Sequence, residues 1–227
     1  MAFLNLLGAF FSWILNLQEH LQNLIDQYGA WTYGILFFII FCETGLVILP
    51  FLPGDSLLFT AGAFAATGAF SIHLLLVLLA AAAIIGDTIN YWIGAHLSRS
   101  VFTEDSRFFK KQYLEKTEAF YEKHGGKTIV LARFIPIIRT FAPCVAGMSN
   151  MNYTRFVVYN VLGGVLWVAL FLYGGFLFGN IPLVQDNFSL VILGIIAISL
   201  IPIISNMVSI RREKKKAAAE STEHRQH

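Results

Sequence analysis

Four ionisable residues lie in apolar segments of the 227-residue chain, where an ionised side chain is costly. Glu43 falls inside one apolar run, and Asp55 directly follows the break P-F-L-P-G. Arg133 and Arg139 fall in a second apolar run that holds two prolines. Each charge at the centre of a membrane costs about 2.5–3.5 kcal/mol, so the two arginines together require about 5–7 kcal/mol of compensation. We therefore expect the two carboxylates to face the two guanidiniums.

These residue types favour one chemistry. Planar guanidiniums recognise phosphate through paired hydrogen bonds, and carboxylates can take up and release protons. The hypothesis is that Arg133 and Arg139 bind the phosphate of a lipid, while Glu43 and Asp55 hold the arginines when ionised and free them when protonated. Ionisable groups on broken helices are typical of transport sites. The alternative is a purely structural ion-pair cluster that locks the two segments together.

Three further polar residues are candidates for supporting roles. Asp87 lies in the run G-D-T-I-N-Y, with Asn90 one helical turn later. These residues either line the cavity of the expected transport site or bond a neighbouring helix. Asn160 is expected to make a hydrogen bond between helices. Cys42 and Cys144 stand apart in apolar runs and fit neither a disulfide nor a metal ligand set. The sequence therefore predicts no metal site and no cofactor.

The elements that position these residues are predicted to be membrane helices. Hydrophobic residues make up 56% of the chain and charged residues 13%, whereas soluble domains have about 45–50% and about 25%. This composition excludes an ordinary water-soluble domain. Because one crossing takes about 20 apolar residues, we predict an all-α, polytopic membrane protein with about four transmembrane helices. The expected crossings are Trp31–Leu49, Ile72–Leu97, Tyr153–Gly179 and Phe188–Ile210.

Two other apolar segments are predicted to enter and leave the membrane on one side. Basic residues collect in the loop 98–127 and in the tail 211–227, which places both in the cytoplasm. Three apolar stretches between two cytoplasmic ends cannot all cross, so residues 128–147, with their arginines and prolines, are expected to form a re-entrant hairpin. By analogy, residues 50–71 form a second, opposed hairpin, giving an inverted repeat. A full crossing by residues 50–71 is the alternative.

The outer parts of the chain are predicted to lie at the membrane surface. Residues 1–27 carry a polar stripe at helical spacing, which indicates an amphipathic interfacial helix. Within the loop 98–127, residues 106–124 are expected to form a second amphipathic helix that ends at the two following glycines. Residues 28–210 make up the membrane domain, and residues 211–227 form a basic cytoplasmic tail.

Three stretches of sequence carry a joint pattern: F-C-E-T-G-L-V-I-L-P-F-L-P-G-D-S-L-L-F (Phe41–Phe59), G-D-x-x-N-Y-x-x-G (Gly86–Gly94) and A-R-F-I-P-I-I-R-T-F-A-P-x-x-A-G-M (Ala132–Met148). Together they resemble the bacterial DedA family of inner-membrane proteins, which are related to the eukaryotic VTT-domain lipid scramblases. The resemblance implies two opposed re-entrant hairpins in a multi-pass protein of the bacterial inner membrane. It also implies translocation of lipid carriers, chiefly the recycling of undecaprenyl phosphate for cell-envelope synthesis, driven by the proton gradient.

The acidic pair of the family matches Glu43 and Asp55, and its arginine pair matches Arg133 and Arg139. The expected function is therefore a proton-motive-force-dependent lipid translocase, or flippase, whose partners are the lipid bilayer, a polyprenyl-phosphate lipid and protons. The alternatives are a proton-coupled exporter of cationic drugs or small molecules and a general phospholipid scramblase.

Two other classes of protein are disfavoured by the sequence. An enzyme is disfavoured because the sequence has no H-E-x-x-H helix, nucleophile elbow or Walker loop. A nucleic-acid partner is disfavoured by the net charge of +2, with the basic residues confined mainly to two segments. The sequence leaves a homo-oligomer open.

Overall fold

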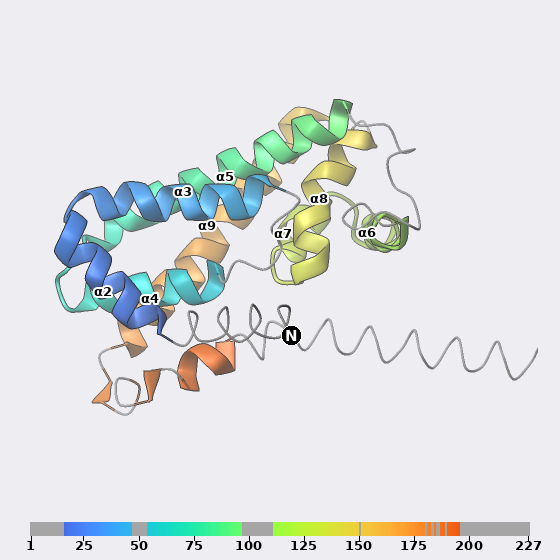
Figure 1. Ribbon diagram of the computed structural model, residues 1–227. Coiled ribbons are helices and arrows are strands. Elements are labelled where there is room, and N and C mark those ends of the chain that lie inside the picture. Colours follow the sequence, from blue (N-terminus) through green and yellow to red (C-terminus); the bar gives the residue numbers. More distant parts are fainter. Residues whose placement is uncertain are drawn as a thin grey trace, which may run out of the picture.

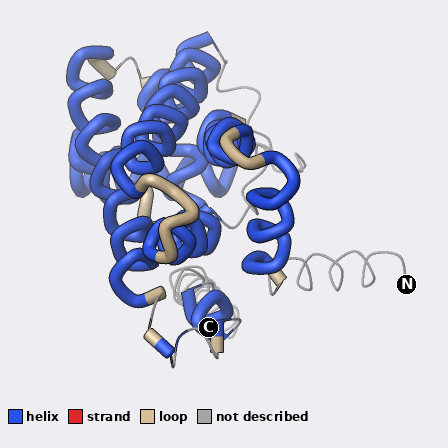
Figure 2. Tube along the Cα trace, turned by 90° about the vertical axis from the view of Figure 1, so that its left-hand side faces the viewer, coloured by secondary structure: helices blue, strands red, loops and turns tan. Residues whose placement is uncertain are grey.

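The computed structural model describes residues 16–46, 54–96, 111–149 and 151–179, together with 181–182, 184, 187–188 and 190–195. All regular structure in these ranges is helical, which confirms the all-α class for this part of the chain (Figure 2). In chain order the elements are α2 (Leu17–Tyr28), α3 (Trp31–Gly45), α4 (Gly54–Ala66), α5 (Ile72–His96), α6 (Lys111–His124), the short η2 (Gly125–Lys127), α7 (Thr128–Ala132), α8 (Pro136–Met148) and α9 (Tyr153–Phe178).

Two long apolar helices, α5 and α9, cross each other, and most of the shorter helices pack against one of them (Figure 1). They have 25 and 26 residues, or about 37 and 39 Å at about 1.5 Å per residue. Both are long and apolar enough to cross a membrane, whose hydrocarbon core is about 30 Å thick. By length and composition, two of the expected crossings are therefore present.

The other two expected crossings stay predictions. Helix α3 ends at Gly45, and Leu46 is extended, with φ −100° and ψ 110°, so the helix is shorter than the expected Trp31–Leu49. Its 15 residues span about 22 Å, less than the thickness of the hydrocarbon core. Most of Phe188–Ile210 lies outside the described residues.

The short helices pack across the molecule. Helix α4, from the first half of the chain, packs along α9 of the second half, and α8, from the second half, packs along α5 of the first. Helix α3 lies beside α5 (Figure 1). Helices α4 and α8 thus each rest on the long helix of the opposite half, whereas α3 lies on the long helix of its own half, and the two halves interlock.

The segment expected to form a re-entrant hairpin, residues 128–147, is a pair of short helices separated by a break. Helix α7 ends at Ala132, and α8 begins at Pro136 after the extended residue Ile135. Proline is well suited to the first turn of a helix, where its missing N–H is not needed. In the opposed segment 50–71, residues 54–66 form α4, which is buried along nearly its whole length, and residues 50–53 lie outside the described part. Entry of either segment into a membrane stays a prediction.

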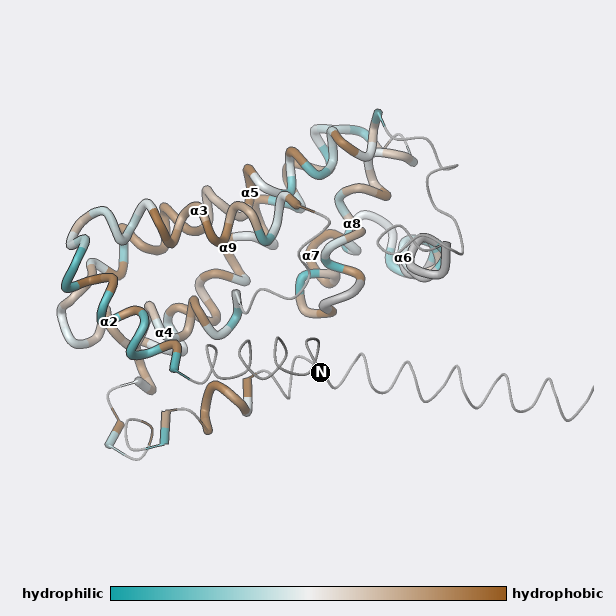
Figure 3. The backbone as a smooth tube through the Cα atoms, viewed as in Figure 1, coloured by the Kyte–Doolittle hydropathy of each residue, from teal (hydrophilic) through white to brown (hydrophobic). Residues whose placement is uncertain are grey.

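The long helices turn apolar side chains outward and polar side chains inward. On α9, Asn160 is buried, whereas Leu162, Leu166 and Leu170 are each more than half exposed. On α5, Asp87 is buried, and the exposed side chains are mainly apolar. Figure 3 shows the mainly hydrophobic course of α3 and α9. This is the reverse of a soluble protein and the arrangement of helices that face lipid.

The structure describes part of each of the two outer segments predicted to be amphipathic helices, and residues 1–15 and 106–110 lie outside the described residues. Helix α2 covers the end of segment 1–27 and buries Leu17 and Leu21 in the core shared with α4. Helix α6 ends at His124, and Gly125 follows with φ +58°, as the glycine pair predicts. The positions of both helices at a membrane surface stay predictions. The tail 211–227 lies outside the described residues.

Helix α6 is fastened to α8 by a tyrosine. The Tyr121 hydroxyl donates a hydrogen bond of 2.9 Å to the carbonyl oxygen of Ala142. Burial raises the pKa of the Tyr121 phenol, so the hydroxyl keeps its proton and remains a donor at neutral pH.

Candidate functional site

Five elements bring polar side chains together in the middle of the bundle. The end of α3, the start of α4, the middle of α5, the break between α7 and α8 with the first turn of α8, and the middle of α9 all meet there. Nearly all of these polar side chains are buried, and the residues around them are apolar. The group comprises Glu43, Thr44, Asp55, Asp87, Asn90, Arg133, Arg139, Thr140, Asn160 and Trp167.

Arg139 on α8 bridges two carboxylates. Its Nη2 lies 2.5 Å from Oε1 of Glu43, and its Nη1 lies 3.2 Å from Oδ1 of Asp55. The Arg139 side chain is 15% exposed. One guanidinium therefore joins the end of α3 to the start of α4, in the two-pronged geometry that suits charge-assisted hydrogen bonds.

Trp167 on α9 completes this group. Its indole Nε1–H donates a hydrogen bond of 2.9 Å to Oδ1 of Asp55. Its ring centroid lies 4.7 Å from Cζ of Arg139, a cation–π contact. Trp167 is completely buried, so both contacts are shielded from solvent.

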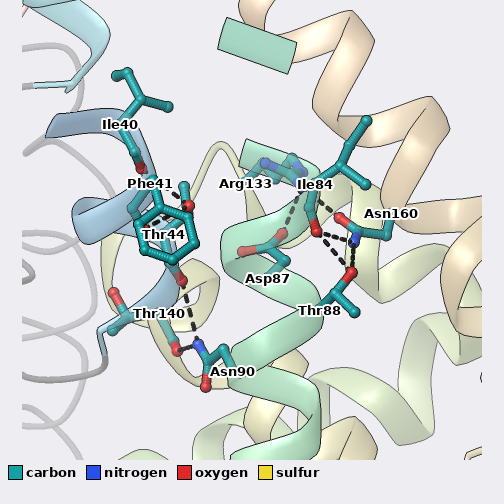
Figure 4. A network of polar contacts seen from close by, with 10 residues as sticks. All are labelled: Ile40, Phe41, Thr44, Ile84, Asp87, Thr88, Asn90, Arg133, Thr140 and Asn160. Carbon is teal, nitrogen blue, oxygen red and sulfur yellow. Dashed lines mark hydrogen bonds and ion pairs between the residues drawn. The ribbon is translucent and has the colours of Figure 1, made fainter. Parts of the chain in front are cut away.

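Arg133, in the break after α7, has a separate set of partners (Figure 4). Its Nη2 forms a buried ion pair with Asp87 of α5 and donates a hydrogen bond of 2.6 Å to Oδ1 of Asn160 on α9. The expectation that Glu43 and Asp55 hold both arginines is thus correct for Arg139 and wrong for Arg133. The rotation of α5 places Asp87, and not the two expected carboxylates, against Arg133.

The two asparagines link neighbouring elements. Asn160 donates hydrogen bonds to the Ile84 carbonyl, at 3.0 Å, and to the Thr88 hydroxyl, at 3.3 Å, which confirms the expected bond between helices. Asn90 donates to the carbonyl oxygen of Thr140 at 2.9 Å and more weakly to that of Thr44 at 3.5 Å. In Figure 4 the amide nitrogen of Asn90 points toward both threonines. Asp87 and Asn90 were expected either to line a cavity or to bond a neighbouring helix. Both residues bond to neighbouring elements, and Asp87 also lines the cavity described below.

Glycines make room for the charged side chains. A Cβ at Gly54 would overlap the Glu43 carboxylate, which therefore lies against the start of α4. The N-terminus of a helix favours negative charge. On α9, a Cβ at Gly163 or Gly164 would come within 3.2 or 3.3 Å of the Arg133 guanidinium. Glycines are therefore needed at both places, beside Glu43 and beside Arg133, because a larger residue would crowd the charged side chain.

The charged groups surround a small cavity of about 10 Å³, enough for one water molecule at most. The ion pairs nearly fill the site, which has no room for a larger ligand in this conformation. The lining residues are Glu43, Thr44, Asp87, Arg133, Arg139 and Thr140.

Sequence reasoning did not identify Trp167, Thr44 or Thr140 as part of the site. For Trp167 a signal exists, because Asn160, Gly163, Gly164 and Trp167 share one face of α9 at steps of three, four and seven. This face is the buried one. The two threonines bond to Asn90 through their backbone carbonyls, and such contacts cannot be recognised from residue types.

Comparisons with known proteins agree with this architecture. The VTT domain family matches residues 52–177, from just before α4 almost to the end of α9. The chain is 52% identical to Protein DedA of Escherichia coli over 218 residues, which cover 95% of this chain and 98% of that protein. The chain belongs to the DedA family. The resemblance seen in the three stretches of sequence is therefore confirmed.

Other DedA-family relatives are named as membrane proteins. The chain is 44% identical over 187 residues to an uncharacterized membrane protein of Mycobacterium tuberculosis, with 81% of this chain and 82% of that protein covered. It is 34% identical over 151 residues to the inner membrane protein YqjA of Escherichia coli, with 66% and 69% covered. No solved structure matches the chain. Together with the outward apolar surface, these names make this DedA-family chain a membrane protein.

Proposed function

We propose that this DedA-family chain is a proton-motive-force-dependent lipid translocase of the bacterial inner membrane that recycles undecaprenyl phosphate for envelope synthesis. The observation that carries the proposal is Arg139, a mostly buried guanidinium held between two carboxylates at a small cavity. A lipid phosphate offers the same pair of acceptor oxygens as the two carboxylates, so it can replace them.

The surroundings of Arg139 favour an anion. Arg139 lies in the first turn of α8, and its partner Asp55 lies in the first turn of α4. Helix N-termini carry partial positive charge, and short helices whose N-termini face the substrate are common in transporters for anionic substrates. In the proposal Arg133 is the second ligand of the phosphate. Its buried Nε–H has no hydrogen-bond partner among the described residues and supplies the donor.

Proton coupling follows from competition for Arg139. When Glu43 and Asp55 are ionised, they hold the guanidinium. Protonation from the periplasm removes their charge and frees Arg139 for the phosphate, and loss of the protons to the cytoplasm restores the ion pairs and expels the lipid. Because the cavity is too small for a phosphate group, α4 and α8 must separate during the cycle.

The test is reconstitution of the full chain in liposomes with labelled undecaprenyl phosphate, with and without a pH gradient. The expected result is flipping that the gradient accelerates. Arg139→Gln should abolish it while the protein still elutes as a single species. Arg155→Gln is the matched control, because Arg155 is an exposed arginine at the start of α9. Wild-type flipping no faster than in protein-free liposomes would refute the proposal.

Two arms of the same experiment separate the other functions. In an exporter of cationic drugs the arginines are only counter-ions, so Arg139→Lys should retain activity. A planar fork for phosphate should not survive that change, and flipping should fall at least about tenfold. A general scramblase should move labelled phosphatidylethanolamine equally well and without a gradient.

A further inference from the structure

One side chain touches both members of the central ion pair. Trp167 of α9 donates its indole N–H to Asp55 at 2.9 Å and presents its ring face to Arg139 at 4.7 Å. Asp55 and Arg139 are themselves 3.2 Å apart, through the same Oδ1 that accepts from the indole. Trp167 is completely buried at this point.

Both contacts depend on charge. A hydrogen bond to a carboxylate stabilises the ionised form over the protonated form. The electron-rich face of an indole ring attracts a guanidinium, and this attraction is strongest away from water. The N–H at the edge of the Trp167 indole thus stabilises the ionised Asp55 carboxylate, and the face of the same ring stabilises the Arg139 guanidinium.

We propose that Trp167 is a positioning residue of the transport site, which stabilises the ion pair between Asp55 and Arg139 and thereby sets the pH dependence of flipping. This inference rests on the proposed function above. Loss of the indole N–H removes one donor that stabilises the carboxylate in the position where it holds Arg139, so the ion pair is weakened.

Other charged and titratable groups lie on the elements around this ion pair. The cavity is lined by Glu43 from α3, Asp87 from α5, Arg133 from the break after α7 and Arg139 from α8. Helix α2, which also packs on α4, carries Glu19, His20 and Asp26. All of these remain in a Trp167 variant, so a change in pH dependence reports on the indole itself.

The first measurement is the pH dependence of lipid flipping. Trp167→Phe keeps an aromatic ring beneath Arg139 and removes the N–H donor. The pH of half-maximal flipping is expected to rise by about one unit, the worth of one hydrogen bond to a charged group. Trp92→Phe is the control, because Trp92 is half exposed on α5 and contacts Tyr91, His96 and Tyr153 instead. A uniform loss of rate with no change in the half-maximal pH would overturn the proposal.

The second measurement needs no lipid substrate. With Trp13, Trp31 and Trp92 replaced by Phe, Trp167 is the sole tryptophan, and its fluorescence in detergent should titrate with pH. Asp55→Asn in the same background should remove that titration. Emission that ignores pH, or that titrates equally in Asp55→Asn, overturns the role of Trp167. Emission that titrates as expected in a protein that flips no lipid supports the role of Trp167 and refutes the proposed function.

Discussion

The two buried arginines have different partners. Arg139 meets two carboxylates and an aromatic face, all from other helices. Arg133 meets one carboxylate and one amide, and Asn160 ties that group further to α5. Arg139 is 15% exposed and Arg133 6%. Of the two, Arg139 is the more accessible, and Arg133 joins α5, α9 and the break after α7.

The Arg133 ion pair leads to a prediction on stability. Asp87→Leu leaves Arg133 as a buried charge without its counter-ion, which costs about 3–5 kcal/mol. Thermal unfolding in detergent should therefore begin at a clearly lower temperature. The double variant Asp87→Leu with Arg133→Met removes both charges and should recover most of the loss. If the double variant is no more stable than the single one, the pair does not hold these elements together.

The cost of placing charge in apolar segments identified the residues of the site, but it did not identify which of them pair with each other. Glu43, Asp55, Arg133 and Arg139 are recognisable because charge in an apolar run needs a partner. The Asp87 pair with Arg133 was not predicted, since linear spacing does not give the rotation of α5 relative to the break after α7. The same holds for the glycines at the site, whose role depends on which side chain approaches them.

At the level of elements, the two crosswise contacts are built alike. Where α4 meets α9, a Cβ at Gly62 would overlap the Leu172 carbonyl. Where α5 meets α8, a Cβ at Gly94 would overlap the Cys144 carbonyl, and Gly147 approaches α5 equally closely. Small residues that let backbones touch are the usual means of packing helices in membranes.

Gly175 on α9 gives a sharp test of the contact with α4. A Cβ there would overlap the Phe59 carbonyl oxygen, so Gly175→Ala forces α4 away from α9. Overpacking of this kind costs about 1–3 kcal/mol, and it also displaces Asp55, so both melting temperature and flipping rate should fall. Gly174→Ala is the matched control, because its Cβ would meet nothing closer than 3.9 Å. Equal effects of the two substitutions would contradict the close contact.

Helix boundaries were predicted unevenly. The end of α6 and the break in 128–147 follow from glycine and proline, which act locally. The early end of α3 was not predicted, because Leu46 and the residues after it are apolar and give no local stop signal. There Gly45 packs directly on the backbone of Gly86, a contact that is visible only in three dimensions.

For the whole molecule, the outward apolar surface predicts contact with lipid. Leu166 on α9 is 52% exposed, yet in a membrane that surface is covered by acyl chains. In a chain without Cys42 and Cys144, Leu166→Cys should resist a membrane-impermeant maleimide in intact vesicles. Lys127→Cys, at the exposed end of the basic loop, should react from the cytoplasmic side. Rapid labelling of Leu166→Cys would show that α9 faces water.

The crosswise packing also has a consequence for synthesis. Helix α4 leaves the ribosome before α9, its main packing partner, has been made. At about 5–20 residues per second this delay lasts several seconds. During that time the surface of α4 that packs on α9, which includes Gly62, is not covered by its partner helix. Neither half of the chain can complete its own core, so two halves expressed separately should be stable only when they are produced together in the same cell.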